Sequence, residues 1–429
     1  MLNLNRLVAL AALTAALLER WAAVQPVLWF FAAALVPSLV MAGHRLGSVH
    51  VATPLALFCL LVPVSLAWND DPGYSYRAVL TFCAFLVIAL WLVVWETPSS
   101  ALALLAAAAA VTALASILTA VVAPDLVRIQ IDNPGAFRGI FTHKNWLALA
   151  MGYMLLAAMY LAARRALVRW AIMAAAILIL IFAKSTGAYL AIAITLVVLS
   201  ARAWLRRLPP VRQRIIEVIA TVSAAVLIYV GFQWVYRLAV DFGKGNSIDR
   251  RFQLWNVALS YAYERPLLGW GWQGTWNYSR GVTGDISRDM GGFEGTSAHN
   301  GFVDVFLQVG LIGSALLAIL LVQVIWPRVT DPSLRGWSAL ALFSAIFTIS
   351  DSFLAGHVPI LVIVTGYLFG RNPHLWRRSQ ETEVCGAVRA GHQVVRASGP
   401  RHAQAGQADR MRNRTKASTT PVSDPASQR

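Results

Sequence analysis

Charged residues and cysteines are scarce in this sequence of 429 residues. Charged side chains make up 13% of it, whereas a soluble globular protein carries roughly 25%. Hydrophobic side chains make up 58%, in long runs separated by short polar connectors. This composition argues against a soluble protein with one buried core and indicates that lipid surrounds most of the chain.

The sequence also lacks the patterns of several enzyme classes. It has no Walker-type phosphate loop, no HExxH and no GxSxG motif. Its cysteines lie in two apolar runs and in the C-terminal tail, so neither a disulfide framework nor a cysteine metal site is predicted. The acidic residues between the apolar runs are scattered, which disfavours metal-assisted and carboxylate-pair catalysis. We therefore expect no metal and no other cofactor.

A net charge of +16 raises the alternative of nucleic-acid binding. Much of this charge lies in short connectors and in the tail 378–429, without a basic helix or an aromatic-studded sheet pattern, so no nucleic acid is expected as a partner. The tail is rich in Ala, Arg, Gln and Ser, and we expect it to be disordered. It either touches anionic lipid headgroups or is simply solvated.

Apolar runs long enough for a bilayer predict an all-α, polytopic membrane domain over residues 1–377, with about twelve transmembrane helices. The first run is short, but no clear signal-peptide cleavage site follows it, so we interpret it as a retained helix. The expected spans are 7–19, 24–42, 51–68, 76–95, 101–123, 145–162, 168–183, 186–201, 215–236, 300–326, 334–350 and 355–370.

Lysine and arginine are unevenly divided between the short connectors. One set of connectors, counted with the N-terminal Arg6, holds about twice as many as the other, which places both termini in the cytoplasm. We expect a bacterial inner-membrane protein with segments 124–144 and 237–299 in the periplasm. The second segment is long and rich in Trp and Tyr, which is typical of a functional loop. Within it, residues 250–263 have a helical pattern and are expected to lie along the membrane surface.

Cationic side chains in these outer segments are candidates for binding a diphosphate at the membrane surface. Arginine forms forked hydrogen bonds to phosphate oxygens and keeps its charge. For any single arginine the alternative is a solvated or snorkelling side chain. The candidates are Arg138, Arg250, Arg251 and Arg265, to which Lys144 and Lys184 add positive charge.

Two histidines each precede an apolar span, His143 in His-Lys-Asn and His299 in His-Asn-Gly. A histidine at the water–lipid boundary can serve as general base for a hydroxyl nucleophile. The alternative, and the commoner role of a lone histidine, is a hydrogen bond at a helix start. Trp255, Trp270 and Trp272 offer indole faces that stack on sugar rings, although each is also typical of a membrane-interface anchor.

These residues fall in three motif blocks that resemble the O-antigen ligase and polysaccharide polymerase family. The blocks agree with the family in order and spacing over roughly 130–315, and Thr-His-Lys-Asn is most similar to the exopolysaccharide polymerase branch. The blocks are Arg138-Gly-Ile-Phe-Thr-His143-Lys144-Asn145; Arg251-x-x-x-Trp255 with Pro266-Leu-Leu-Gly-Trp-Gly-Trp272; and Ala298-His299-Asn300-Gly-Phe-Val-Asp304, continuing to Gly310 and Gly313.

The resemblance implies a GT-C-like membrane glycosyltransferase that performs inverting, metal-independent transfer from a glycan on undecaprenyl diphosphate. Carried over by position, Arg251 and Arg138 would bind the diphosphate, His299 would act as base or orient the acceptor, and Asn300 would support His299. Many relatives have an arginine in the turn where this chain has Thr186, and Lys184 is its candidate replacement. Membrane lipids, a chain-length regulator and export proteins are the further partners considered.

Three alternatives remain at this point. A polymerase joins one lipid-linked repeat to another, and the Thr-His-Lys-Asn block favours it. A ligase moves the same glycan onto another acceptor, such as the lipid A core. A polysaccharide transporter is disfavoured, because it predicts charged residues within spans, whereas Asp304 and Asp351 lie near span edges.

Overall fold

The computed structural model describes residues 4–128, 134–161, 166–205, 207–209, 211–212, 215, 245–276, 281–291, 297–326, 334–354 and 357–377. Helices make up nearly all the regular structure of these residues, and an isolated bridge joins Arg128 to Phe137. The predicted all-α class is confirmed. In chain order the elements are α1 (Leu4–Leu17), α2 (Gln25–Met41), α3 (Gly43–Gly47), α4 (Thr53–Val64), η1 (Ser65–Trp68), α5 (Pro72–Trp95), α6 (Pro98–Val122), η2 (Pro124–Val127), α7 (Lys144–Met159), α8 (Ala166–Ala183), α9 (Thr186–Leu205), α11 (Gly245–Glu264), α12 (Gly281–Asp289), α13 (Gly301–Ile325), α14 (Arg335–Phe347) and α15 (Val358–Arg371).

Every predicted span whose residues are described coincides with one of these helices. The predicted span 215–236 lies outside the described residues apart from its first position, so the total span number stays a prediction. Among the described helices, 5 are long and apolar enough to cross a membrane. They are α5 from Ser75, α6, α8, α9 and α13.

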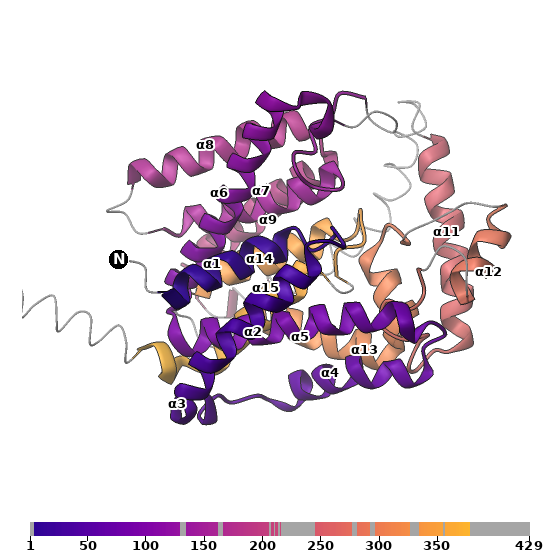
Figure 1. Cartoon of the computed structure of the whole chain (residues 1–429), viewed down its shortest axis with the longest axis horizontal. Coiled ribbons are helices and arrows are strands. Elements are labelled where there is room, and N and C mark those ends of the chain that lie inside the picture. Colours follow the sequence, from indigo (N-terminus) through magenta and orange to yellow (C-terminus); the bar gives the residue numbers. More distant parts are fainter. Residues whose placement is uncertain are drawn as a thin grey trace, which may run out of the picture. The chain divides into compact units, whose positions relative to one another are not determined.

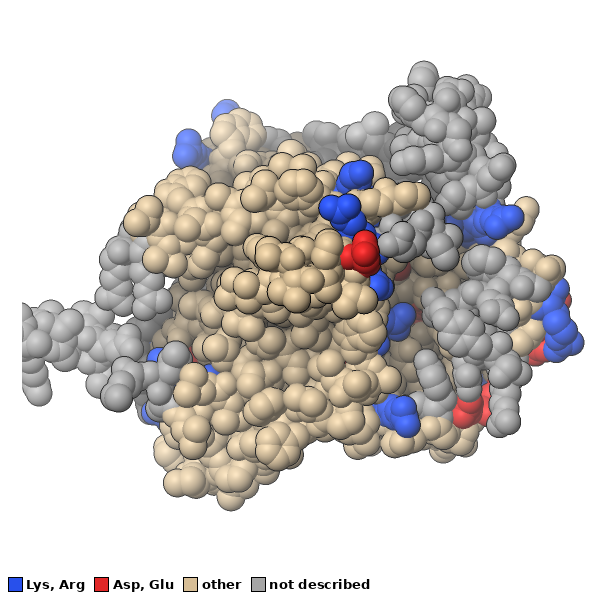
Figure 2. All heavy atoms as spheres, turned by 45° about the horizontal axis from the view of Figure 1, so that its top comes forward, with Lys and Arg blue, Asp and Glu red and all other residues tan. Residues whose placement is uncertain are grey.

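Large apolar side chains cover much of the outer surface of these helices. On α8, Ile177, Leu178, Ile181 and Phe182 are all 46–58% exposed, and only 22% of the helix is buried inside the protein. Contiguous apolar surface of this kind is costly in water but suits contact with lipid. Figure 2 shows a wide expanse without Lys, Arg, Asp or Glu, with the charged side chains toward its edges.

The N-terminal helices pack through small side chains. Helix α1 contacts α2 and α6, and α5 contacts α2 and α15, so these elements lie side by side (Figure 1). Ala9, Ala12 and Ala16 of α1 and Ala101 and Ala108 of α6 are all 0% exposed. Alanines allow helix backbones to approach closely, which is the main way that helices associate where lipid removes the hydrophobic driving force.

Polar contacts between the connectors lie at the ends of the spans. In one group of connectors, Arg6 at the start of α1 forms an ion pair with Glu96 at 2.6 Å. In another group, the Trp21 indole N–H after α1 donates to the carbonyl of Ile140 before α7, at 2.8 Å. The second contact joins two connectors that the charge distribution predicts on the outer side, so the fold brings these connectors together.

Helix α13 is broken at Gly310, where φ is +60°. Residues 266–271, which precede α13 in the chain, pack against the break. The Leu311 N–H donates to the Pro266 carbonyl at 2.8 Å, and the Trp270 N–H donates to the Leu307 carbonyl at 2.9 Å. These bonds satisfy backbone groups that a broken transmembrane helix would otherwise leave unpaired in an apolar environment. The sequence predicted a single continuous span here, so the break is a finding of the structure.

Helix α11 confirms the helical pattern predicted for 250–263 and ends before Pro266. Its buried row is Leu254, Ala258 and Ala262, which packs with Leu307 of α13 in a small core of its own. The sequence pattern predicts a face of Phe252, Trp255, Leu259 and Ala262; of these, Ala262 is buried in this core and Trp255 packs against it. The difference arises because α12 and α13 supply a protein surface for this helix to pack against.

Candidate functional site

A connected set of polar side chains joins four sequence-distant segments at the ends of the helices. The His299 Nδ1 lies 3.4 Å from Oδ1 of Asp351. The Asn145 side-chain amide donates to Oδ2 of Asp351 at 2.9 Å, and the Ser185 hydroxyl donates to the Asn145 carbonyl oxygen at 2.9 Å. Both oxygens of the Asp351 carboxylate are therefore engaged, one by a histidine and one by an amide.

Asp351 lies in the link between α14 and α15. The Ser352 N–H donates to its side chain at 2.8 Å, and the Thr348 hydroxyl donates to its carbonyl at 3.1 Å. The Gly301 N–H, at the start of α13, donates to the Thr348 carbonyl at 2.8 Å. This contact ties the Asp351 link to the helix that follows His299, which keeps the carboxylate and the imidazole together.

His299 itself has a left-handed backbone, with φ +51°. A non-glycine residue adopts this conformation only where its surroundings hold it there. The preceding Ala298 is held at both polar groups, because its N–H donates to Asp304 at 3.0 Å and its carbonyl accepts from Trp255 at 2.7 Å. Asn300 caps α13 by accepting from the Phe302 N–H at 3.0 Å. The backbone on either side of His299 is thus fixed.

The electrostatics of the site follow from these contacts. Burial alone would raise the pKa of the Asp351 carboxyl, but the hydrogen bond and charge of His299 and the amide of Asn145 hold that pKa well below its ordinary value. Asp351 is therefore a carboxylate at neutral pH. A carboxylate facing Nδ1 favours the tautomer with its proton on that nitrogen, which leaves Nε2 as the basic position.

Arg251 contacts the backbone of the link that holds Asp351. Its guanidinium donates to the carbonyl of Ser350, the residue before Asp351, at 3.2 Å, and its side chain is half-buried. Arg250 is exposed. The structure thus brings His299, Arg251 and Asn145 together around the Asp351 link. Asn300 follows His299 directly, and its side chain caps α13.

Other predicted cationic residues make contacts with backbone carbonyls. The Arg138 guanidinium donates to the carbonyl of Leu126 at 3.0 Å and to that of Thr142 at 3.3 Å. Lys144 is buried and its Nζ donates to the carbonyl of Lys184 at 3.2 Å. These contacts give Arg138 and Lys144 a role in shaping the connectors, in addition to any contact with substrate.

Three further predicted site residues are His143, Arg265 and Trp272. His143 caps α7 by accepting from the Asn145 N–H at 3.3 Å, which matches the helix-start alternative. The Arg265 guanidinium lies 3.8 Å from the Trp270 ring centre. Trp272 is 0% exposed and packs edge-on with Phe58 and Phe82, so it occupies a core position instead of a sugar-stacking one.

Asp351 is the functional candidate that the sequence alone did not identify. It was seen only as an acidic residue at a span edge, where a charge is unusual and costly. No spacing rule connects it to His299 or Asn145, because the three meet only through packing.

In the described part of the chain, no group of three or more His, Cys, Asp or Glu side chains lies close enough together to hold a metal ion.

Comparison with known proteins agrees with the second and third motif blocks, which lie within the residues that a family model matches. The sequence model of the O-antigen ligase family matches residues 171–318. The exopolysaccharide production protein ExoQ of Rhizobium meliloti (strain 1021) is 25% identical over 299 residues, which is 66% of this chain and 67% of that protein. The predicted family resemblance is confirmed. With its apolar helices, this O-antigen ligase- and polymerase-like chain is a membrane-embedded protein.

Proposed function

We propose that this protein polymerises saccharide repeat units carried on undecaprenyl diphosphate, by inverting glycosyl transfer at the periplasmic face of the bacterial inner membrane. The family similarity supports polysaccharide polymerisation or ligation in general and a glycosyltransferase-like class of enzyme. The Thr-His-Lys-Asn block favours polymerisation over ligation.

The observation that carries the proposal is the His299–Asp351 contact beside Arg251. In the proposed reaction, Nε2 of His299 takes the proton of an acceptor hydroxyl. The hydroxyl oxygen attacks the anomeric carbon of the donor and forms the new glycosidic bond. The bond from that carbon to the diphosphate oxygen breaks, its electron pair leaves with the diphosphate, and the configuration inverts.

Each residue has a distinct part in this scheme. Asp351 holds the imidazole by Nδ1 and stabilises the imidazolium that forms. Arg251 stabilises the charge that grows on the diphosphate, an electrostatic contribution that is often the largest in such reactions. The diphosphate is already a good leaving group, so the scheme requires no nucleotide and no metal.

The test is glycan analysis of a strain that lacks the protein, complemented with wild type or with Arg251→Ala. Accumulation of single lipid-linked repeats and loss of long polymer support the polymerase. Long polymer that forms but stays on its lipid carrier identifies the alternative, a ligase. Unchanged glycans in the deleted strain exclude both.

A further inference from the structure

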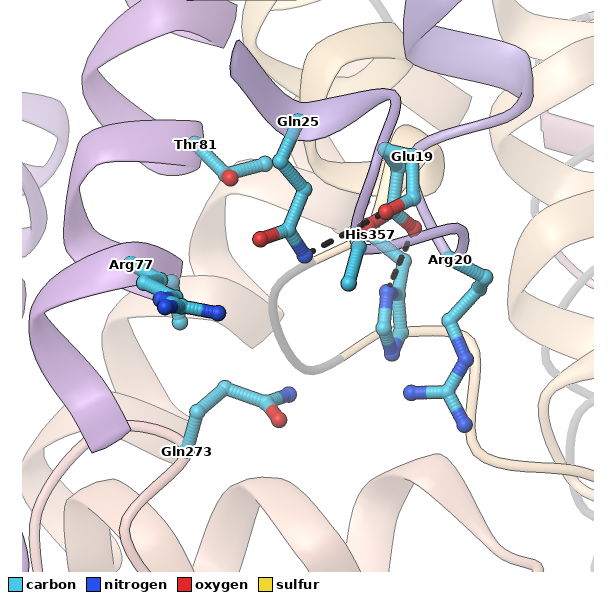
Figure 3. Close-up of a pocket in the computed structure, with 9 residues that line it drawn as sticks. Glu19, Arg20, Gln25, Arg77, Thr81, Gln273 and His357 are labelled. Atoms are coloured by element: carbon cyan, nitrogen blue, oxygen red, sulfur yellow. Dashed lines mark hydrogen bonds and ion pairs between the residues drawn. The ribbon is translucent and has the colours of Figure 1, made fainter.

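A cavity with both polar and apolar lining lies apart from the His299–Asp351 contact, between the α1–α2 link, the start of α5, the turn that holds Gln273 and the residue before α15. Its volume is 170 Å³. This volume accommodates a small group such as a phosphate or a carboxylate. The side chains that define it in Figure 3 are Glu19, Arg20, Gln25, Arg77, Gln273 and His357.

Two guanidinium groups determine the charge of the open part of this cavity. Arg20 and Arg77 come from different elements and lie on opposite sides of it (Figure 3), and both side chains are exposed. Glu19, the carboxylate in the lining, is buried and lies 2.7 Å from Nδ1 of buried His357. Because His357 engages that carboxylate, the cavity presents mainly cationic groups to a ligand.

The lining also offers groups suited to a hydroxylated ligand. The Gln25 side chain reaches toward the cavity and donates to the Glu19 carbonyl at 3.3 Å, and Gln273 enters from its turn (Figure 3). The Arg20 guanidinium lies over the Trp146 ring, 5.3 Å from its centre. Stacking on an indole uses the face of a guanidinium and leaves its N–H groups, which lie in the plane, to bind an anion.

The cavity and the His299–Asp351 contact lie near one aromatic cluster. The Trp146 ring centre is 4.7 Å from that of His357, a cavity residue, and 4.7 Å from that of Phe353. Phe353 is two residues from Asp351, and Asn145, which binds Asp351, precedes Trp146 in the chain. The buried rings of Trp146, Phe353 and His357 therefore connect the cavity lining to the link that holds Asp351.

We propose that this cavity is a second anion-binding site, which takes a phosphate or carboxylate group of a saccharide substrate while another part of that substrate reacts near His299. A guanidinium group binds either anion through charge-assisted hydrogen bonds, and both anions fit the cavity volume. The ligand class rests on the proposed function, because it assumes that the substrate is a lipid-linked glycan.

The test uses purified full-length protein in detergent and chemical modification of arginines with phenylglyoxal, followed by mass spectrometry at constant ionic strength. The probes are inorganic pyrophosphate, methyl glucuronide and, as the neutral control, methyl glucoside. Arg45 is the internal control, because it stacks over Trp95 as Arg20 does over Trp146 but does not line the cavity.

We expect an anionic probe to slow modification of Arg20 and Arg77 several-fold and to leave Arg45 unaffected. Protection by pyrophosphate identifies a phosphate group, and protection by methyl glucuronide identifies a carboxylated sugar. In Arg20→Gln, the concentration of probe needed to protect Arg77 should rise about tenfold, as expected for losing one charge-assisted contact. Arg45→Gln should leave that concentration unchanged.

Two results would overturn the site. One is modification of Arg20 and Arg77 that neither anionic probe slows relative to Arg45, and the other is equal protection by the neutral glucoside. Neither result bears on the polymerase proposal, which is measured by glycan analysis in cells. Conversely, an unchanged glycan profile in the deleted strain would contradict the proposed reaction. It would not affect the protection of Arg20 and Arg77 by anions, which is measured on the purified protein.

Discussion

The His299 imidazole and the Asp351 carboxylate lie 3.4 Å apart, although one precedes helix α13 and the other follows helix α14. The histidine side chain is 36% exposed and the aspartate 14%. An imidazole that opens to solvent on one side and meets a buried carboxylate on the other has the arrangement of a general base with an orienting partner. The first two predictions concern this pair.

Asp351→Asn is expected to reduce glycan product by roughly a hundredfold or more, because the asparagine can present its amide to Nδ1 and leave Nε2 without a free lone pair. The measurement is polymer yield from a strain that expresses the variant at wild-type level. Asp289→Asn is the control, since Asp289 is an exposed carboxylate at the end of α12 that accepts from the Tyr261 hydroxyl at 2.8 Å. Equal polymer from Asp351→Asn and the control would remove Asp351 from the mechanism.

The stability difference between wild type and Asp351→Asn should depend on pH. The folded pKa of Asp351 is lowered, so its carboxylate stabilises the fold fully above the unfolded value of about 3.9 and less as the pH falls below it. Each pH unit below that value removes up to about 1.4 kcal/mol. Thermal unfolding in detergent should therefore show a larger gap between the two proteins at pH 7 than at pH 3. A gap that is equal at both values would contradict the lowered pKa.

Arg251→Lys is expected to lower polymer yield at least about tenfold, even though it keeps the positive charge. Lysine lacks the planar fork that arginine uses to bind a diphosphate and at the same time to donate to the Ser350 carbonyl. Arg250→Lys, at the exposed neighbouring position, is the control and should have a smaller effect. A larger loss of polymer from Arg250→Lys than from Arg251→Lys would mean that Arg250 makes the diphosphate contact.

Gly310→Ala should destabilise the protein by at least ~2 kcal/mol, because alanine is strained at φ +60° and its Cβ would meet the backbone of Leu267. Gly370→Ala is the control, since a Cβ there has nothing within 4 Å. It should be neutral, or stabilise the helix by up to about 1 kcal/mol. The measurement is thermal unfolding in detergent. Equal unfolding temperatures for the two variants would mean that the break in α13 can relax.

Much of the fold follows from local sequence properties. A run of about 20 apolar residues satisfies its own backbone hydrogen bonds only as a helix in lipid, so composition and length located the described spans. Helix caps were equally local, because Asn300 reaches only the amides directly after it. The motif blocks around Arg251 and His299 carry the family resemblance for the same reason, since each is a short contiguous pattern.

What the tertiary structure decided is which of these segments meet. Asp351 reaches His299 and Asn145 only because α7, α13 and the α14–α15 link pack at one end of the spans. The break at Gly310 needs a partner segment from elsewhere in the chain to satisfy its backbone. The cavity between Arg20 and Arg77 joins elements that the sequence places far apart. Such contacts depend on side-chain packing over long sequence separations, which hydrophobic periodicity and positive-inside charge do not encode.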